Sequence, residues 1–446
     1  MPARLHHRLA RSCAICAALL GTLSLSAAAG PPLPGYYQES GLSSNRAQVN
    51  YNITEYIDPF SGVLQLHQID DTIPGNGQFN LTIQRSYNSP STAYGTVSDT
   101  QSYNRTPDLG MGWNLLIGGR AFNVSDTGGA CAGGNQLIVE TPDGGKQGLL
   151  RQSDGTFLSA ARWKGQCVVG GVRIYAPNGT RYDMLQMIVE SIPGVVQLAP
   201  FYYPTRIEDR NGNYATLTYV ASGSIVLLDN VSTSDGRTVS FGYTLTGSRQ
   251  LLTSVNAMGR LWTYSYYPTP ILPDSLGGNG TYALSRVDPP NGGFWEYDYY
   301  LCTNSTANKC ALSEVWYPSG ANIVYTYTLT NFNDGSGDAR VVATKGVGGT
   351  VIPVGEGDLN WTFTYTPGTP GAMDKTEVTS TLGKMTYEHV RHSTVGPGNT
   401  WQIGLLTKRT VQNAATANSV IEVETLTWDK QQIEVAPRSW TVSRDS

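Results

Sequence analysis

Charged residues are scarce in this chain of 446 residues. Asp, Glu, Lys and Arg make up 14% of it, against roughly 25% in typical soluble domains. The net charge is −4 and no basic stripe or block occurs, so we predict no binding to nucleic acid. The chain has 50 glycines and 26 tyrosines. This composition favours sheets and turns over disorder, because disordered chains are usually highly charged and poor in aromatic residues.

The sequence also lacks the short motifs of common catalytic and cofactor sites. Neither GxSxG nor GxxxxGK[ST] occurs. His389 and His392 would point to opposite faces of a strand, which is poor geometry for binding one metal ion. Residues 331–338 are rich in oxygen donors, but Val342 stands where a calcium loop needs glutamate. We predict no enzymatic activity, cofactor or metal, although a catalytic triad dispersed in the sequence would leave no such motif.

Long apolar runs are missing after the N-terminus, so we predict no transmembrane helix. At the N-terminus, arginines precede a short apolar segment, residues 13–25, and three alanines end at Ala29. This order is typical of a secretory signal peptide. We predict a signal peptide at residues 1–29, cleavage between Ala29 and Gly30, a linker at residues 30–50, and secretion or a location in the periplasm or at the cell surface.

Cysteine is rare beyond the predicted signal peptide. The remaining four are Cys131, Cys167, Cys302 and Cys310. An even number in an exported chain favours disulfides. We predict the local pairs, Cys131 with Cys167 and Cys302 with Cys310. The alternative is four buried thiols.

A tyrosine-ended hairpin recurs at least five times. The first copy is RIEDRNGNYATLTY, residues 206–219, in which Asn211-Gly212 predicts a tight turn that needs φ > 0. Intervals of 23 to 33 residues separate the turn glycines, a spacing typical of stacked repeat units. These glycines are Gly212, Gly236, Gly259, Gly292 and Gly320.

Each copy carries apolar side chains three, five and seven residues after its glycine, and side chains two apart share one face of a strand. A single hairpin cannot bury such a face, whereas adjacent hairpins bury it against one another. We therefore predict an all-β fold whose antiparallel hairpins form a curved strip, with the rings as core rather than as a sugar platform. The repeat aromatics are Tyr219, Tyr243, Trp262, Tyr266, Trp295, Tyr299 and Tyr327.

Three regions follow the predicted linker. Residues 51–204 contain short strands separated by Gly-rich turns, and residues 205–327 hold the clear repeats. Residues 328–446 hold a degenerate copy around Gly383 and further strands.

The repeats resemble the YD repeats of the rearrangement-hot-spot (RHS) family. Three segments before them strengthen the resemblance: DPFSG (58–62), DDTIPGNGQFNLTIQRSYNS (70–89) and LGMGWNLLI (109–117). The resemblance covers residues 50–446. It implies a β-sheet strip that spirals into a hollow shell, which in some members encloses a toxin or effector and in others mediates surface contact or has been linked to carbohydrates. The DPxGL self-cleavage motif of a complete RHS core is absent, and we expect no effector domain in this chain.

We predict a non-catalytic shell or scaffold segment of an exported RHS-type protein. Its expected partner is further shell or effector sequence. A glycan-binding surface module is the alternative, and an outer-membrane β-barrel is less favoured because the strands are uneven. We also expect that the shell does not close. Aromatic faces near its last strands would then lack packing partners, and the chain would associate with itself or need a partner.

Overall fold

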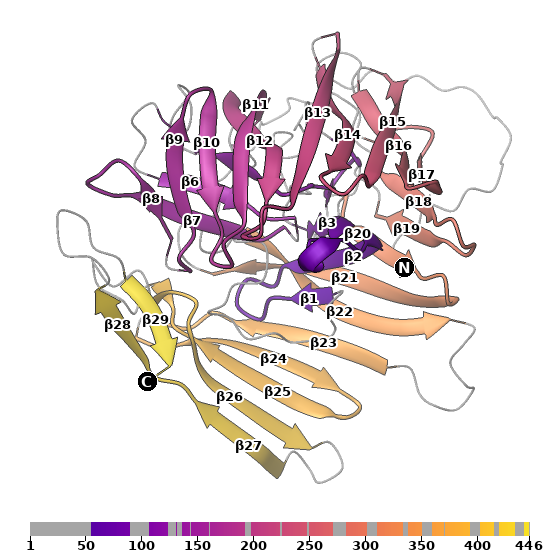
Figure 1. Cartoon of the computed structure of the whole chain (residues 1–446). Coiled ribbons are helices and arrows are strands. Elements are labelled where there is room, and N and C mark those ends of the chain that lie inside the picture. The colour runs from indigo at the N-terminus through magenta and orange to yellow at the C-terminus, as the bar shows by residue number, and fades with distance from the viewer. Residues whose placement is uncertain are drawn as a thin grey trace, which may run out of the picture.

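The computed structural model is built almost entirely of strands (Figure 1). A short 3-10 helix, Asn76–Gln78, lies in the first part of the chain. Every pairing between named strands is antiparallel, which confirms the predicted fold class. The predicted signal peptide, linker and Cys302 lie outside the described residues. Those residues are 55–89, 107–123, 131, 136–142, 144–159, 161–191, 198–223, 225–247, 249–270, 282–300, 310–332, 338–349, 359–369, 371–392, 402–413, 419–432 and 441–445.

The first body is a four-stranded sheet at the centre of the molecule (Figure 1). Its strands are β1 (Glu55–Ile57), β2 (Leu64–Ile73), β3 (Leu81–Asn88) and β4 (Trp113–Asn114). We call residues 55–89 and 107–117 the plug. Apolar side chains of β2 and β3 alternate with polar ones, as strand geometry requires, and Leu64, Leu66 and Ile83 are buried. The plug therefore offers an apolar face to the strands around it.

A small barrel, β5–β12, follows the plug. It closes where β12 pairs with β5, Phe201 opposite Phe122 and Tyr202 opposite Ala121. Aliphatic side chains and Phe157 fill its interior, as in other barrels of this strand number. Its strands are β5 (Arg120–Phe122), β6 (Gln136–Glu140), β7 (Lys146–Arg151), β8 (Phe157–Leu158), β9 (Lys164–Val168), β10 (Gly171–Tyr175), β11 (Arg181–Ser191) and β12 (Leu198–Glu208).

From β12 the sheet continues as a long strip that curves around the plug (Figure 1). Each strand pairs with its sequence neighbours. The strip consists of β13 (Tyr214–Ser222), β14 (Ile225–Thr233), β15 (Thr238–Thr246), β16 (Arg249–Ala257), β17 (Arg260–Tyr266), β18 (Leu284–Asp288), β19 (Trp295–Tyr299), β20 (Leu312–Trp316), β21 (Ala321–Asn331), β22 (Asp338–Gly349), β23 (Leu359–Thr366), β24 (Asp374–Ser380), β25 (Gly383–His389), β26 (Leu406–Asn413) and β27 (Ser419–Thr425). A separate hairpin, β28 (Trp428–Gln432) and β29 (Thr441–Asp445), comes last.

The concave face of the strip is filled by the plug. Repeat aromatics such as Tyr297, which is fully buried, share one apolar core with plug residues such as Ile83 and Trp113. This packing continues to Tyr387 in β25, which is 1% exposed. The expectation that aromatic faces near the last strands lack packing partners is therefore wrong. Tyr387 belongs to the same buried cluster as plug residues such as Ile83.

Candidate functional site: the interface of plug and strip

Glycines of the plug mark the places where its turns approach the strip. Gly62 lies against Val341, and its carbonyl accepts a hydrogen bond of 2.9 Å from the Val342 amide. A Cβ on Gly110 would lie 2.6 Å from the Tyr282 carbonyl oxygen. Both glycines have positive φ, 69° and 80°, so two constraints require glycine there. They belong to the DPFSG and LGMGW segments, whose glycines thus dock the plug on the strip.

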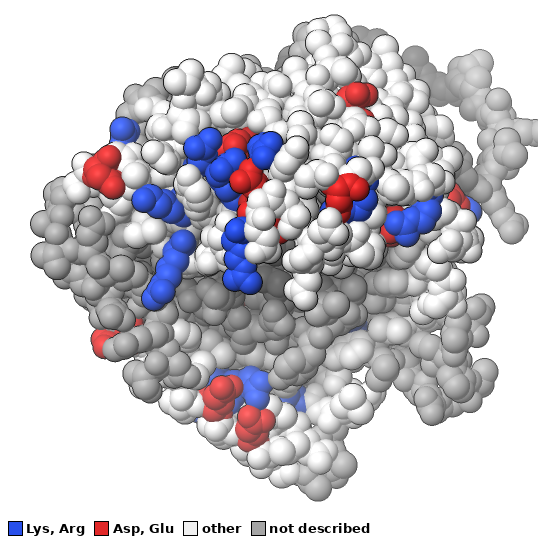
Figure 2. All heavy atoms as spheres, viewed as in Figure 1, with Lys and Arg blue, Asp and Glu red and all other residues white. Residues whose placement is uncertain are grey.

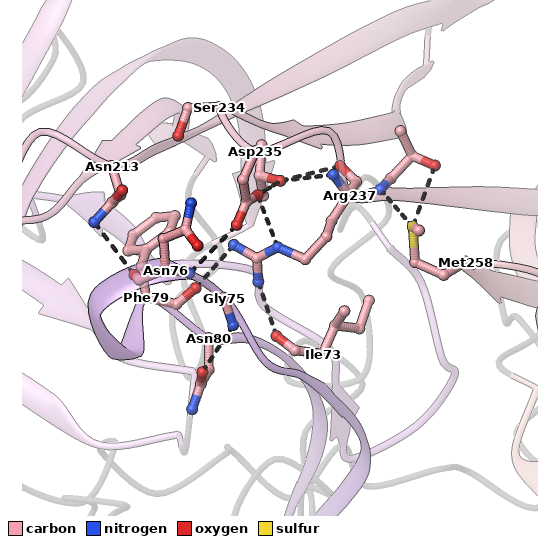
Figure 3. A network of polar contacts seen from close by, with 12 residues as sticks. Ile73, Gly75, Asn76, Phe79, Asn80, Asn213, Ser234, Asp235, Arg237 and Met258 are labelled. Carbon is pink, nitrogen blue, oxygen red and sulfur yellow. Dashed lines mark hydrogen bonds and ion pairs between the residues drawn. The ribbon is translucent and has the colours of Figure 1, made fainter.

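The PGNG turn docks through Arg237, at the tip of the β14–β15 hairpin (Figure 3). The Arg237 guanidinium donates hydrogen bonds of 2.8 Å to the Ile73 carbonyl and 2.9 Å to the Phe79 carbonyl. A side chain on Gly75 would overlap that guanidinium. Asp235 accepts from Arg237 Nε at 2.8 Å, and hydrogen bonds from Arg237 lower its pKa. One arginine therefore satisfies two backbone carbonyls of the plug turn.

An ion pair lies at the centre of the interface. Arg85 of β3 and Asp70 of β2 have no exposed side-chain surface and are 2.8 Å apart. Tyrosines of the strip form hydrogen bonds with both charged groups. Arg85 Nη1 donates to the Tyr297 hydroxyl at 2.6 Å, and the Tyr264 hydroxyl donates to Asp70 at 2.8 Å. Tyr297 in turn donates to Gln68 at 2.6 Å. Two strands of the plug and two of the strip meet in this network.

Aromatic rings surround the Arg85 guanidinium. The rings of Trp113, Trp295 and Tyr297 have centroids 5.5 to 5.7 Å from it, a distance that gives cation–π attraction. Burial alone would lower the pKa of Arg85, but Asp70 and Tyr297 raise it above its usual value. Burial raises the pKa of Tyr297 as well. The arginine therefore stays charged and the tyrosine stays a neutral hydrogen-bond donor.

Two more ion pairs hold the plug at other strands of the strip. Lys345 of β22 lies 2.5 Å from Glu55 of β1, which also accepts a 3.0 Å bond from the Tyr325 hydroxyl. Arg249 of β16 lies 2.6 Å from Asp108. Both pairs are almost fully buried. Breaking such a pair on one side leaves an uncompensated buried charge, which is strongly destabilising.

The tyrosine hydroxyls of the repeats join the second strand of each hairpin to its first strand. Each donates to the carbonyl of a residue at a register shift in the sheet, where a bulge interrupts the ladder of backbone hydrogen bonds. Phenylalanine would fill the same space but leave that carbonyl without this donor. The bonds run from Tyr219 to Pro204 (2.8 Å), Tyr243 to Leu228 (2.7 Å), Tyr266 to Leu252 (2.6 Å), Tyr299 to Leu284 (2.9 Å) and Tyr327 to Leu312 (2.9 Å).

The other residues singled out in the sequence also have definite places. The five repeat glycines all have φ between 83° and 88°. Trp262 and Trp295 are ring neighbours, with centroids 5.9 Å apart. A disulfide joins Cys131 to Cys167 beside the barrel core, and Cys310 is disulfide-bonded to a residue outside the described part.

Neither a metal site nor a membrane-spanning helix is found in the described part of the chain. No three His, Cys, Asp or Glu side chains converge there. No helix there has the length and hydrophobicity to cross a bilayer. His389 is buried, with its ring 5.6 Å from that of Phe60.

The buried ion pairs at the interface of plug and strip were not predicted from the sequence. Their one signal in the sequence is that charged residues stand in apolar strands, as Arg85 does in LTIQRSYN.

Comparisons with known proteins add distant structural neighbours. No protein-family model and no curated protein matches the sequence. A crystal structure of TcdB2–TccC3 is 12% identical, with a TM-score of 0.35, over 87% of this chain and 28% of that one. A Photorhabdus luminescens Tc holotoxin pore is 11% identical, with a TM-score of 0.34, over 91% of this chain and 24% of that one. The N-terminal domain of the Salmonella typhimurium effector SpvB is 12% identical, with a TM-score of 0.13, over 85% of this chain and 100% of that one. This chain thus spans well under two thirds of the first two structures.

Proposed function

We propose that this protein is a non-catalytic shell or scaffold segment of RHS type, whose curved strip encloses polypeptide. The observation that carries the proposal is the plug itself, a segment of the same chain held on the concave face of the strip. Its three glycine turns contact places far apart along the strip: the β14–β15 turn, β22 and the residues before β18. A strip with this inner face is suited to wrap a β-rich segment.

The chemistry of the interface supports a structural role. Asp70, Glu55 and Asp108 each have a basic partner within 2.8 Å, and Asp70 and Glu55 also accept from tyrosine hydroxyls. General acids and bases need an accessible reacting group and a pKa near the working pH. These side chains are instead buried and bound to their partners. Groups of this kind hold two bodies together.

Aromatic side chains also favour a shell over a glycan-binding module. Trp262 and Tyr264 are 6% and 3% exposed. On the outer face, arginine side chains cover rings: Arg206 lies 3.7 Å from the ring centroid of Tyr214. A sugar platform needs an open aromatic face, and these rings are not open.

Export is part of the same proposal. The disulfide between Cys131 and Cys167 supports it, because disulfides persist in oxidising compartments. N-terminal sequencing of protein recovered outside the cytoplasm should begin at Gly30. Recovery there with Met1 intact would contradict cleavage.

Limited proteolysis with trypsin tests the enclosure. The bond after Arg85, in the plug, should resist cleavage, whereas the bond after Arg210, in an exposed hairpin turn, should be cut first. Cleavage after Arg85 at a similar rate in the folded protein would refute enclosure. A glycan array serves as the second arm, and a loss of glycan binding with an unchanged melting temperature in a Trp262→Ala variant would favour the glycan-binding module.

A further inference from the structure

The last strand of the strip, β27, has a different environment from the strands before it. Val420, Ile421 and Val423 are 56%, 63% and 52% exposed, whereas β26 beside it has no exposed residue. In the registers of the described strands, β27 pairs with β26 alone. Among the described strands none pairs with its other edge, which carries exposed aliphatic side chains. An edge of this kind accepts a further strand.

The described residues that follow β27 form backbone and indole hydrogen bonds elsewhere. The Leu426 amide donates to the Thr407 carbonyl at 2.9 Å, and Trp428 Nε1 donates to the Leu406 carbonyl at 2.6 Å. The chain thus stays beside β26 as it leaves β27. The next hairpin, β28–β29, forms a sheet of its own. Elsewhere in the strip each strand is followed by one that pairs with it, so the edge of β27 is suited to a strand from another polypeptide.

Charges at this edge specify the chemistry of that strand. Arg409 of β26 forms ion pairs with two carboxylates, Glu422 at 2.8 Å and Glu424 at 3.3 Å. The side chains of these glutamates are 53% and 43% exposed. Because two carboxylates share one guanidinium, this group of three side chains carries one excess negative charge. Figure 2 shows acidic and basic side chains together at this end of the molecule, apart from the charged side chains on the upper half of the view.

Charge alternates from strand to strand in the neighbouring rows. Lys375, Glu388 and Lys408 lie opposite one another across β24, β25 and β26, and Arg409 lies opposite Glu424 across β26 and β27. Opposite charges facing each other across strands stabilise a sheet, and like charges destabilise it. The row that ends at Glu424 therefore continues best with a basic residue.

A second copy of β27 fits this edge poorly. In the antiparallel registers centred on Glu422 or on Val423, a glutamate of one copy faces a glutamate of the other. We infer that β27 is a docking edge for an extended strand of another polypeptide, aliphatic in alternation and basic opposite Glu422 and Glu424. This surface is separate from the plug interface and does not depend on the enclosure proposed above.

A peptide-binding experiment on the full chain tests the inference. The probe is a labelled peptide with the sequence LTKRTVQN, residues 406–413, because that strand already pairs with β27 on its other side. Its matched control carries Lys408→Glu and Arg409→Glu. Fluorescence anisotropy gives the affinity, and hydrogen exchange locates the protected amides. We expect the basic peptide to bind at least about tenfold more tightly than the acidic one and to protect residues 420–425.

Charge reversal in the protein gives the decisive comparison. The double variant Glu422→Lys with Glu424→Lys should prefer the acidic peptide, whereas Glu377→Lys in the interior strand β24 should keep the preference for the basic one. Circular dichroism checks that both variants are folded. The inference is overturned if folded wild-type protein binds neither peptide, binds both equally, or protects β27 through a concentration-dependent dimer without added peptide.

Discussion

The barrel β5–β12 and the strip β13–β27 are both built from antiparallel hairpins, yet they are stabilised differently. The barrel closes on itself, and its interior contains aliphatic side chains and Phe157. The strip stays open and shares its core with the plug, through buried ion pairs as well as apolar contacts. A sheet that closes supplies its own core, whereas an open curved sheet needs a second body on its concave face. The barrel should therefore survive changes that separate plug from strip.

The largest effect should come from breaking the central ion pair. Asp70→Ala leaves Arg85 charged and buried without its partner, so we expect about 3–5 kcal/mol of destabilisation. The loss should appear in the strip and plug while the barrel keeps its structure, which amide-resolved hydrogen exchange in denaturant can measure. The control is Asp288→Ala, which removes a partly exposed pair with Arg286 and should cost at most about 1 kcal/mol. Equal losses in the two variants would contradict the role of the buried pair.

Removal of an aromatic ring from the strip should rank next. Trp262 is 6% exposed and Trp295 is only partly buried. Trp262→Ala should cost about 3–5 kcal/mol, and Trp295→Ala should cost less. Chemical denaturation followed by circular dichroism gives both values. The reverse order would show that burial of these two rings does not control stability.

The disulfide should act on the barrel alone. Cys131→Ser opens a loop with a sequence separation of 36 residues and should cost about 2–4 kcal/mol. Because Cys131 and Cys167 pack against the barrel core, amides of β6–β11 should exchange faster while those of β17–β22 stay unchanged. Uniform acceleration over both regions would mean that barrel and strip unfold together.

The smallest effect should come from a single hydroxyl. Tyr266→Phe keeps the ring and removes the donor to the Leu252 carbonyl, so we expect about 1–2 kcal/mol of destabilisation. Tyr214→Phe, on the outer face under Arg206, is the matched control and should have almost no effect. Thermal melts of the two variants compare them directly. Indistinguishable melts would show that the repeats do not need tyrosine for its hydroxyl.

The sequence predicts the local parts of this fold well. Each repeat glycine, such as Gly236, sits in a turn with positive φ, because hairpin turn chemistry is encoded within a few residues. The alternation after it identifies the inner face of the strip. These features need no knowledge of distant parts of the chain.

The long-range parts could not be predicted in the same way. Arg85 and Tyr297 are 212 residues apart in sequence, and nothing local to either indicates the other. Closure of the barrel depends on a short pairing of Phe122 with Phe201 and of Ala121 with Tyr202, which any two apolar strands could make. The sequence identifies Gly75 of the PGNG turn as a turn residue, but its contact with Arg237 forms only when the strip curves around the plug.

Native-state hydrogen exchange in increasing denaturant tests the central claim most directly, that plug and strip form one cooperative unit. The amides of β2 and β3 should open with the same free energy as those of β17–β22, because each body supplies the core of the other. Amides of the barrel strands β6–β11 should open with a different free energy. If β2 and β3 instead exchange at a much lower free energy while β17–β22 stay protected, the strip does not need the plug, and the claim of one cooperative unit is contradicted.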